Sequence, residues 1–373
     1  MSETQVRRFA AAVICLATLV TSTTLVVAGT ATAAKGAPPS QSGVVVDGPA
    51  PPQIHAKSWL IADADSGEIL AAKNAHARLR PASTLKTLTA VTLLPLLDKQ
   101  REYKVQWEDA AVKGSAVGIV PGATYTIDQL FYGMLLPSGN DAAHALANAA
   151  GGKAKTVTMM NEEAKRLLAY DTTVRNPSGL DSRHQLTSAY DLAIFAREGL
   201  QRTDFRRYVG TITTAFPAEM PKKDKKRKTY QIYNQNELLL DGYRGVIGVK
   251  TGYTTLAGRT FVAAAERGGQ TLIVSLMGIV EPSDVAAERL LNWGFDKVDA
   301  IQPVGNLLAA PGSAHEVRPA SVPASVEVAV EPEASGFHFS WFTAAFAAIL
   351  VFATWLVVRR SRRRPRRASL PPL

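Results

Sequence analysis

The sequence predicts an α/β protein whose single sheet is assembled from strands at both ends of a globular region, with helices between them. Residues 54–300 have a globular composition. Short apolar runs separated by turn residues stand near both ends of this region, and apolar residues at helical spacing fill much of its middle. A region of about 250 residues is long enough for one large α/β unit or for two small lobes.

The first strands and the first helix are indicated early in the globular region. Trp59–Asn74 reads as a β-hairpin, because two apolar runs flank Asp65-Ser66-Gly67, which are typical turn residues. From Pro81 to Leu97, leucine and valine recur at three-residue steps, which predicts a helix. Ser83 falls in the first turn of this helix, where backbone N–H groups carry partial positive charge.

The later elements follow from the same patterns. Two helices are predicted on either side of Pro137-Ser138-Gly139, and three strands and a closing helix are predicted after them. In chain order these elements are helices Ile127–Leu136 and Ala142–Ala150, strands Val246–Tyr253, Arg259–Glu266 and Gln270–Ile279, and helix Ser283–Trp293. Arg267-Gly268-Gly269 favours a hairpin between the last two strands, and Ser283 is a candidate N-cap.

The two ends of the chain predict export and a membrane anchor. Residues 1–34 read as a secretory signal, with an apolar run before the cleavage pattern Ala31-Thr32-Ala33; an uncleaved anchor is the alternative. Residues 337–358 are predicted as a transmembrane helix, because Trp341–Val358 carries no charge and spans about 27 Å. The arginines of residues 359–373 predict a cytoplasmic tail, which places everything before the span outside the cell membrane.

Two segments rich in Pro, Ala and Ser separate these ends from the globular region. We expect residues 35–53 to be a flexible leading segment and residues 301–336 to be an extended tether. The one cysteine, Cys15, lies in the predicted signal. If the signal is cleaved, thiol catalysis, disulfides and thiolate metal sites are excluded.

Most of the formal net charge of +10 comes from the arginines of the predicted cytoplasmic tail and indicates how the chain is oriented in the membrane. Seven of the arginines lie in residues 359–373, so the charge gives no argument for nucleic-acid binding. No pair of the six histidines has the spacing of a metal-binding motif. We therefore predict neither a metal nor a cofactor.

Ser83 and Lys86 are the first candidates for catalysis. Positions i and i+3 of a helix lie on one face, with Cβ atoms about 5–6 Å apart. A serine hydroxyl is a weak nucleophile until a base takes its proton. A lysine can be that base if burial or cationic neighbours lower its pKa.

Two further short motifs can complete a site. Ser138-Gly139-Asn140 stands at the predicted helix break, where Ser138 could relay a proton and Asn140 could hold a substrate amide; a plain turn is the alternative. Lys250-Thr251-Gly252 ends a predicted strand. Its lysine and threonine could bind a carboxylate, and Gly252 would let a substrate backbone approach closely.

Together and in this order, the motifs resemble those of the serine penicillin-recognising enzymes, and among them the low-molecular-mass D-alanyl-D-alanine carboxypeptidases. The resemblance covers residues 54–300 and rests on Pro81–Lys86, Pro137–Ala143 and Gly248–Gly252, with Asn176–Leu180 and Asn234–Leu239 in agreement. It implies a β-lactamase-like fold with a central antiparallel sheet flanked by helices and a mainly helical lobe.

The resemblance implies a serine peptidase that removes the terminal D-Ala from peptidoglycan stem pentapeptides. Ser83 would form an acyl-enzyme with the penultimate D-Ala, and Lys86 would accept the Ser83 proton. Ser138 would pass a proton to the departing D-Ala. β-Lactams would be covalent inhibitors of such an enzyme.

The remaining motif residues would bind the substrate. The resemblance implies that Asn140 binds the substrate amide and positions the catalytic lysine, and that Lys250 and Thr251 hold the terminal carboxylate. The backbone N–H group of Tyr253, which follows Gly252, would form an oxyanion hole with that of the nucleophile.

One residue departs from the pattern of the family. Many relatives carry Arg where Gln235 stands, so carboxylate binding could rest more on Lys250 and Thr251. A β-lactamase is disfavoured because residues 170–185 contain no glutamate to activate a deacylating water. The sequence leaves open a DD-transpeptidase and a non-catalytic, membrane-tethered wall-binding protein, and it leaves the oligomeric state open as well.

Overall fold

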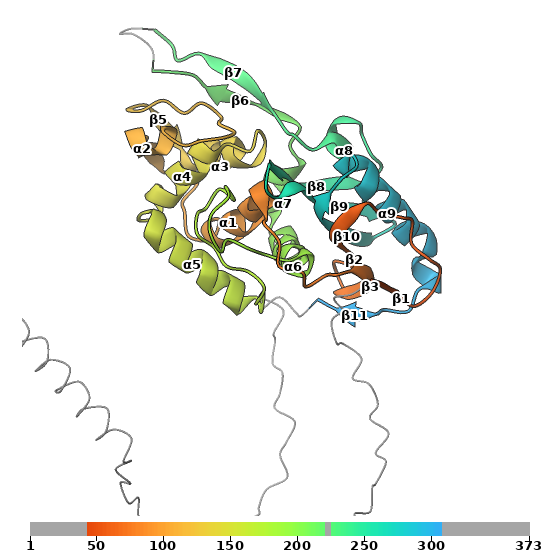
Figure 1. The fold of residues 1–373 in the computed structure, drawn as a ribbon. Helices are drawn as coiled ribbons and strands as arrows, with labels where there is room; N and C mark the ends of the chain where they lie inside the picture. The colour runs from red at the N-terminus through yellow and green to blue at the C-terminus, as the bar shows by residue number, and fades with distance from the viewer. Residues whose placement is uncertain (1–42, 221–224, 308–373) are drawn as a thin grey trace, which may run out of the picture. The chain divides into compact units, whose positions relative to one another are not determined.

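The computed structural model describes residues 43–220 and 225–307, which form a seven-stranded antiparallel sheet with helices on both faces (Figure 1). The strand order is β1-β3-β2-β10-β9-β8, and β11 also pairs with β3. The strands are β1 (Val44–Val46), β2 (Ala56–Asp63), β3 (Glu68–Lys73), β8 (Val246–Thr254), β9 (Gly258–Arg267), β10 (Gln270–Ile279) and β11 (Gly305–Asn306). The prediction of one sheet built from early and late chain is confirmed.

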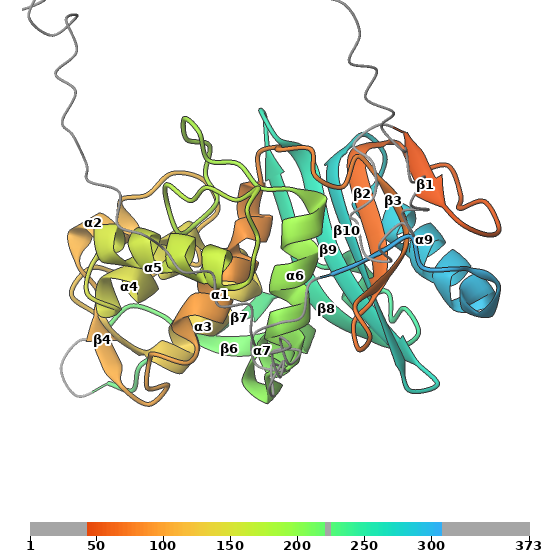
Figure 2. The same cartoon turned by 90° about the horizontal axis from the view of Figure 1, so that it is seen from below.

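Alternation along the strands divides the buried side chains between two cores. In β2, Trp59 and Ile61 belong to one hydrophobic cluster, whereas Leu60 and Ala62 belong to the other. Helix α9 (Ser283–Lys297) packs against β9 and β10 on the first face, and α6 (Ala189–Leu200) packs against β2 and β10 on the second. Figure 2 shows α9 and α6 on opposite sides of the sheet.

A mainly helical lobe adjoins the α6 face, and its side chains share the larger core cluster. Its helices include η1 (Ala82–Leu85), α1 (Lys86–Leu93), α2 (Trp107–Ala110), α3 (Ile127–Leu135), α4 (Asn140–Ala149) and α5 (Lys153–Arg166). The other elements are β4 (Glu102–Lys104), β5 (Thr124–Thr126), α7 (Thr203–Gly210), β6 (Thr213–Pro217), β7 (Thr229–Tyr233), α8 (Glu237–Leu240) and η2 (Val298–Ala300).

The predicted helix from Pro81 to Leu97 is in fact a 3₁₀ turn, η1, followed by the shorter helix α1. Ser83 therefore lies in the 3₁₀ turn, and Lys86 is the first residue of α1. Because side chains at i and i+3 of a 3₁₀ helix are eclipsed, this geometry brings the two residues together even more directly than an α-helix would.

The predicted N-cap of the last helix is displaced by one residue. Ser283 is the first helical residue of α9, and Pro282 occupies the N-cap position with no side-chain capping bond. Proline lacks a backbone N–H and fixes its own φ, so it suits the boundary of a helix.

Two short strands lie in segments that the composition predicted to be linkers. The three valines of β1 pair with Ala71–Lys73, and Gly305–Asn306 pairs with Glu68 and Ile69. The predicted globular region of residues 54–300 is therefore shorter than the folded unit at both ends. At the first end, the β-branched valines suit a strand even within a Pro- and Gly-rich segment.

The predicted signal (1–34), transmembrane helix (337–358) and cytoplasmic tail (359–373) lie outside the described residues. Within the described part of the chain, no helix combines the length and the apolar character needed to cross a membrane.

Candidate active site

Lys86 is the centre of a buried hydrogen-bonded cluster at the start of α1. Its Nζ lies 2.9 Å from Ser83 Oγ, 2.7 Å from Asn140 Oδ1 and 2.7 Å from the carbonyl oxygen of Ser178. Burial lowers the pKa of Lys86 well below the usual lysine value, and the charge of Lys250 lowers it further. The Lys86 amine thus contacts the candidate nucleophile in a setting that favours its neutral form.

Ser138 occupies the break between α3 and α4 that the sequence predicted. Its backbone has a positive φ of 64°, and its hydroxyl is buried without a hydrogen-bond partner among the described residues. Ser83 and Ser138 both line one cleft of about 400 Å³. A buried hydroxyl with unused donor and acceptor capacity is suited to contact a group that enters this cleft.

Asn140, the first residue of α4, links this helix to Lys86 at the start of α1. While its Oδ1 accepts from Lys86, its Nδ2 donates to the carbonyl oxygen of Lys113 at 2.7 Å, and its backbone N–H donates to the carbonyl oxygen of Ser115 at 2.8 Å. Asn140 therefore holds Lys86 in place and fastens the 113–115 loop to α4. Ser115 lines the cleft although it was absent from the predicted site.

Asp141 is a buried carboxylate for which the sequence motifs indicated no role. It accepts backbone N–H groups of Val117, Gly118 and Ile119, at 2.8 to 3.1 Å. Its charge raises the pKa of Lys86, against the larger lowering effects of burial and Lys250. Only its position directly after Asn140 could have drawn attention to it.

Lys250 and Thr251 approach the cleft from β8, at the edge of the sheet. Lys250 is buried, and its Nζ donates to the carbonyl oxygen of Thr251 at 2.9 Å and lies 3.5 Å from the Thr251 hydroxyl. Burial lowers the pKa of Lys250 to about 7. Thr251 lines the cleft, whereas Lys250 and Lys86 are buried and are not among its lining residues.

The structure gives Gly252 a second reason to be glycine, beside the predicted approach of a substrate backbone, which stays a prediction. A Cβ atom there would lie 2.8 Å from the backbone nitrogen of Ser83, 2.9 Å from that of Thr84 and 2.5 Å from Thr260 Oγ1. The absent side chain thus lets β8 pack directly against the η1 turn that carries the nucleophile. Tyr253, the next residue, is 66% exposed beside the cleft.

The cleft extends beyond the predicted residues along the sheet edge. Gln235, which donates to the carbonyl oxygen of Pro137, lies in its wall. Charged side chains outside the predicted site also line it: Glu237, Arg259 and Asp284. Glu237 belongs to the Asn234–Leu239 stretch that agrees with the family pattern, whereas Arg259 and Asp284 lie in no motif, and only the fold brings them to Ser83.

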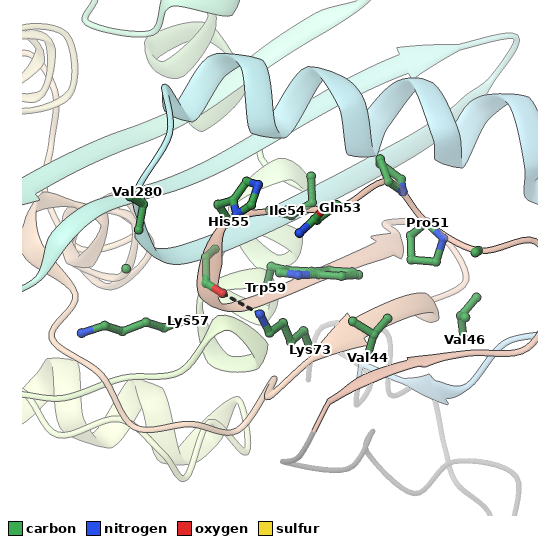
Figure 3. A pocket seen from close by; sticks show the side chains of 14 residues that line it. Val44, Val46, Pro51, Gln53, Ile54, His55, Lys57, Trp59, Lys73 and Val280 are labelled. Atoms are coloured by element: carbon green, nitrogen blue, oxygen red, sulfur yellow. Dashed lines mark hydrogen bonds between the residues drawn. The ribbon is translucent and has the colours of Figure 1, made fainter.

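A larger cavity, of about 730 Å³, lies elsewhere, around Trp59 and Lys73 (Figure 3). It is bounded by β1 and by the segment that leads into β2, and none of the predicted site residues lines it. Size therefore does not identify the site in this protein, whereas the polar cluster at Ser83 does. Among the described residues, His, Cys, Asp and Glu form no group of three that could hold a metal ion.

Comparisons with known proteins identify the family of the chain. A model of the D-alanyl-D-alanine carboxypeptidase family, peptidase family S11, matches residues 45–280. The D-alanyl-D-alanine carboxypeptidase DacB2 of Mycobacterium tuberculosis is 38% identical over 264 residues, which cover 69% of this chain and 86% of the relative. DacF of Bacillus subtilis is 32% identical over 65% of this chain and 63% of its own length.

Solved structures show the same fold. The crystal structure of a D-alanyl-D-alanine carboxypeptidase from M. tuberculosis H37Rv has a TM-score of 0.66 at 36% identity, covering 70% of this chain and 99% of that one. The DD-transpeptidase of Streptomyces K15 has a TM-score of 0.62 at 29% identity, covering 66% and 100%. The family match spans both the Ser83 turn and the Lys250 strand, so the chain belongs to the D-alanyl-D-alanine carboxypeptidase family of serine peptidases.

Proposed function

We propose that the protein hydrolyses the bond between the two terminal D-alanines of peptidoglycan stem pentapeptides through an ester on Ser83. The observation that carries this proposal is the 2.9 Å contact between Lys86 Nζ and Ser83 Oγ. A neutral amine has two N–H donors and one lone pair. Asn140 and Ser178 accept the two N–H groups, which leaves the lone pair of Lys86 for the Ser83 proton.

Acylation then follows from the positions of the two serines. Ser83 Oγ attacks the carbonyl carbon of the penultimate D-Ala while its proton moves to Lys86. The C–N bond breaks, and the proton that Lys86 took from Ser83 passes to the departing amine through the hydroxyl of Ser138, which lines the same cleft, so that Lys86 is neutral again. The backbone N–H groups of Ser83 and Tyr253 stabilise the negative oxygen of the intermediate, and such a donor typically contributes about 2.7–4 kcal/mol.

Deacylation uses the same groups in the opposite direction. Water attacks the ester carbonyl and gives its proton to Lys86, and the ester C–O bond breaks. Lys86 passes that proton to Ser83 Oγ, and the shortened stem peptide leaves as a carboxylic acid, which gives its remaining proton to the solvent. A β-lactam would acylate Ser83 by opening its ring, and the absence of a glutamate in residues 170–185 supports slow release of that ester.

Transpeptidation is a second candidate function, supported by the likeness to the Streptomyces K15 DD-transpeptidase. It needs the same acyl-enzyme and differs only in the acceptor, which is an amine instead of water. The ratio of transferred to hydrolysed product in the presence of an added amine measures the balance.

The first experiment incubates the protein with a pentapeptide that ends in D-Ala-D-Ala and follows free D-Ala. We expect release by the wild type and a loss on the order of a millionfold in Ser83→Ala, because the nucleophile is gone. Ser66→Ala, in the turn between β2 and β3, is the matched control and should keep full activity. Release of D-Ala by Ser83→Ala at the wild-type rate would refute the mechanism.

We also propose that the protein is a single-pass membrane protein whose catalytic unit is extracytoplasmic. The charge-free stretch 341–358 and the arginines that follow it support this topology, as does the signal-like sequence of residues 1–34. Stem peptides of the wall lie outside the membrane, so this location would give Ser83 access to its substrate.

A further inference from the structure

We propose that Arg259 provides the guanidinium that binds the terminal carboxylate of the substrate. Position 235 cannot supply this charge, because Gln235 is neutral. This inference rests on the proposed function, because it assigns a binding group to the same reaction. Both residues line the cleft that holds Ser83.

The register of β8 and β9 brings Arg259 beside the carboxylate-binding motif. Arg259 is paired with Tyr253, and Phe261, two residues along β9, is paired with Thr251. Side chains of i and i+2 share a face of a strand, so Arg259 and Thr251 are diagonal neighbours on one face. Diagonal positions are about 7–8 Å apart, within reach of an arginine side chain.

The other polar groups in and beside the cleft supply little positive charge for binding a carboxylate. Lys250 is buried, and burial lowers its pKa to about 7, so near neutral pH it carries on average only part of a positive charge. The amide of Gln235 is neutral and already donates to Pro137. Glu237 and Asp284 also line the cleft, and their charges would repel a carboxylate.

Arg259 has the properties that this role requires. Its side chain is exposed, and among the described residues that side chain makes no hydrogen bond, ion pair or ring contact. A guanidinium stays charged at every physiological pH and can bind both oxygens of a carboxylate at once. The structure thus offers an uncommitted cation at the place where the substrate's negative end would lie.

The test compares two substrates that differ only in the charge at this end: an acylated D-Ala-D-Ala peptide and the same peptide with a C-terminal amide. We measure kcat/KM for both with the wild type and with Arg259→Gln. For the free carboxylate we expect Arg259→Gln to lower kcat/KM by about ten- to a hundredfold, the usual contribution of a charge-assisted hydrogen bond. For the amide we expect less than about a threefold change, so the preference for the carboxylate should collapse.

Two further variants make the result specific. Arg267→Gln removes a guanidinium at the far end of β9, where it stacks on Tyr243 and Phe295, and should leave the carboxylate preference intact. In Arg259→Gln, the second change Gln235→Arg should restore much of the preference, because it returns a cation to the lining of the cleft.

Equal losses on both substrates would overturn the inference. They would mean that Arg259 only balances Glu237 and Asp284, in which case Asp284→Asn would relieve the loss. The proposed function fails in a different way, because a wild type that releases no D-Ala from the free peptide would refute it before any variant is made. Thermal unfolding of each variant identifies losses caused by misfolding.

Discussion

The two buried lysines of the cleft have different surroundings, and these suit them to different tasks. The Nζ of Lys86 contacts three oxygen atoms from Ser83, Asn140 and Ser178, whereas the Nζ of Lys250 contacts only the carbonyl and hydroxyl oxygens of Thr251 among the described residues. The proposed mechanism needs a neutral Lys86 to accept a proton and a charged Lys250 to attract a carboxylate. Burial lowers both pKa values, so the two requirements oppose one another as the pH changes.

This opposition predicts a bell-shaped dependence of kcat/KM on pH. Activity should rise with pH as Lys86 loses its proton, and it should fall above pH of about 7 as Lys250 loses its charge. In Lys250→Arg the guanidinium cannot be deprotonated, so the alkaline fall should move upward while the acid limb stays in place. An alkaline limb that is identical in Lys250→Arg and wild type would show that another group causes it.

Steady-state kinetics across the acid and alkaline limbs on the D-Ala-D-Ala peptide give both apparent pKa values. The lower maximum expected for the bulkier Arg does not affect the test, because only the position of each limb is compared. Lys73→Arg, far from the cleft at the end of β3, is the matched control and should reproduce the wild-type profile.

At the level of elements, the site depends on the direct contact between β8 and the η1 turn. Gly252 is the point of contact, and Gly179 makes a second one, since a Cβ atom there would lie 1.8 Å from the carbonyl oxygen of Ala82. The nucleophile is therefore held from two sides by backbone that has no side chain in the way. Its position is fixed by tertiary packing as much as by its own helical turn.

Gly252→Ala should displace this turn. The new methyl group would overlap Thr260 Oγ1 and the backbone of Ser83, so we expect a loss of about 1–3 kcal/mol in the free energy of unfolding. We also expect acylation by a fluorescent penicillin to slow at least about a hundredfold, as misplaced catalytic groups generally do. Denaturant unfolding and stopped-flow acylation measure the two effects separately.

Gly294→Ala is the control that separates displacement of the nucleophile turn from a general loss of stability. Its methyl group would meet Ile61 and Leu272 in the core beneath α9, which should lower the free energy of unfolding without touching η1. Folded Gly294→Ala should therefore be acylated at the wild-type rate. If Gly252→Ala also keeps the wild-type rate, the contact between β8 and η1 does not position the nucleophile.

The elements that the sequence predicted are those with strong periodicity or clear turns. The hairpin of β2 and β3, helices α3 and α4, and strands β8 to β10 all combine apolar runs with Gly, Pro or Asp breaks. Helix α5 went unpredicted, because it is polar and buries only Thr156, Met160 and Ala164. The strand β1 was hidden by the Pro-rich composition around it.

The residues of the candidate site were predictable where they belong to short motifs and unpredictable where a backbone group or the strand register supplies the contact. Ser83, Ser138 and Lys250 stood out by residue type and order, and the fold brings them to one cleft or to its wall. Ser178 belongs to the Asn176–Leu180 stretch, but its residue type does not predict that its carbonyl oxygen accepts from Lys86. Arg259 was equally invisible, because only strand register places it diagonally from Thr251.

At the scale of the whole molecule, the cleft exists only after the early and late chain have come together. Ser83 belongs to an early turn and Thr251 to a late strand, and β8 and η1 pack against each other only in the folded unit. An exported chain would therefore gain activity where it folds, which the proposed topology puts outside the membrane.

This topology predicts how the protein partitions between cell fractions. The full chain should remain with membranes after a wash at high salt and alkaline pH, because residues 337–358 would be inserted rather than bound to the surface. A variant that ends after Gly336 should move to the soluble extracytoplasmic fraction and still be labelled by fluorescent penicillin, because all of the site residues precede it. A variant that ends after Val358 loses only the arginine-rich tail and should stay with the membrane. Retention of the Gly336 variant in the membrane would contradict a C-terminal anchor and assign that role to the apolar run of residues 1–34.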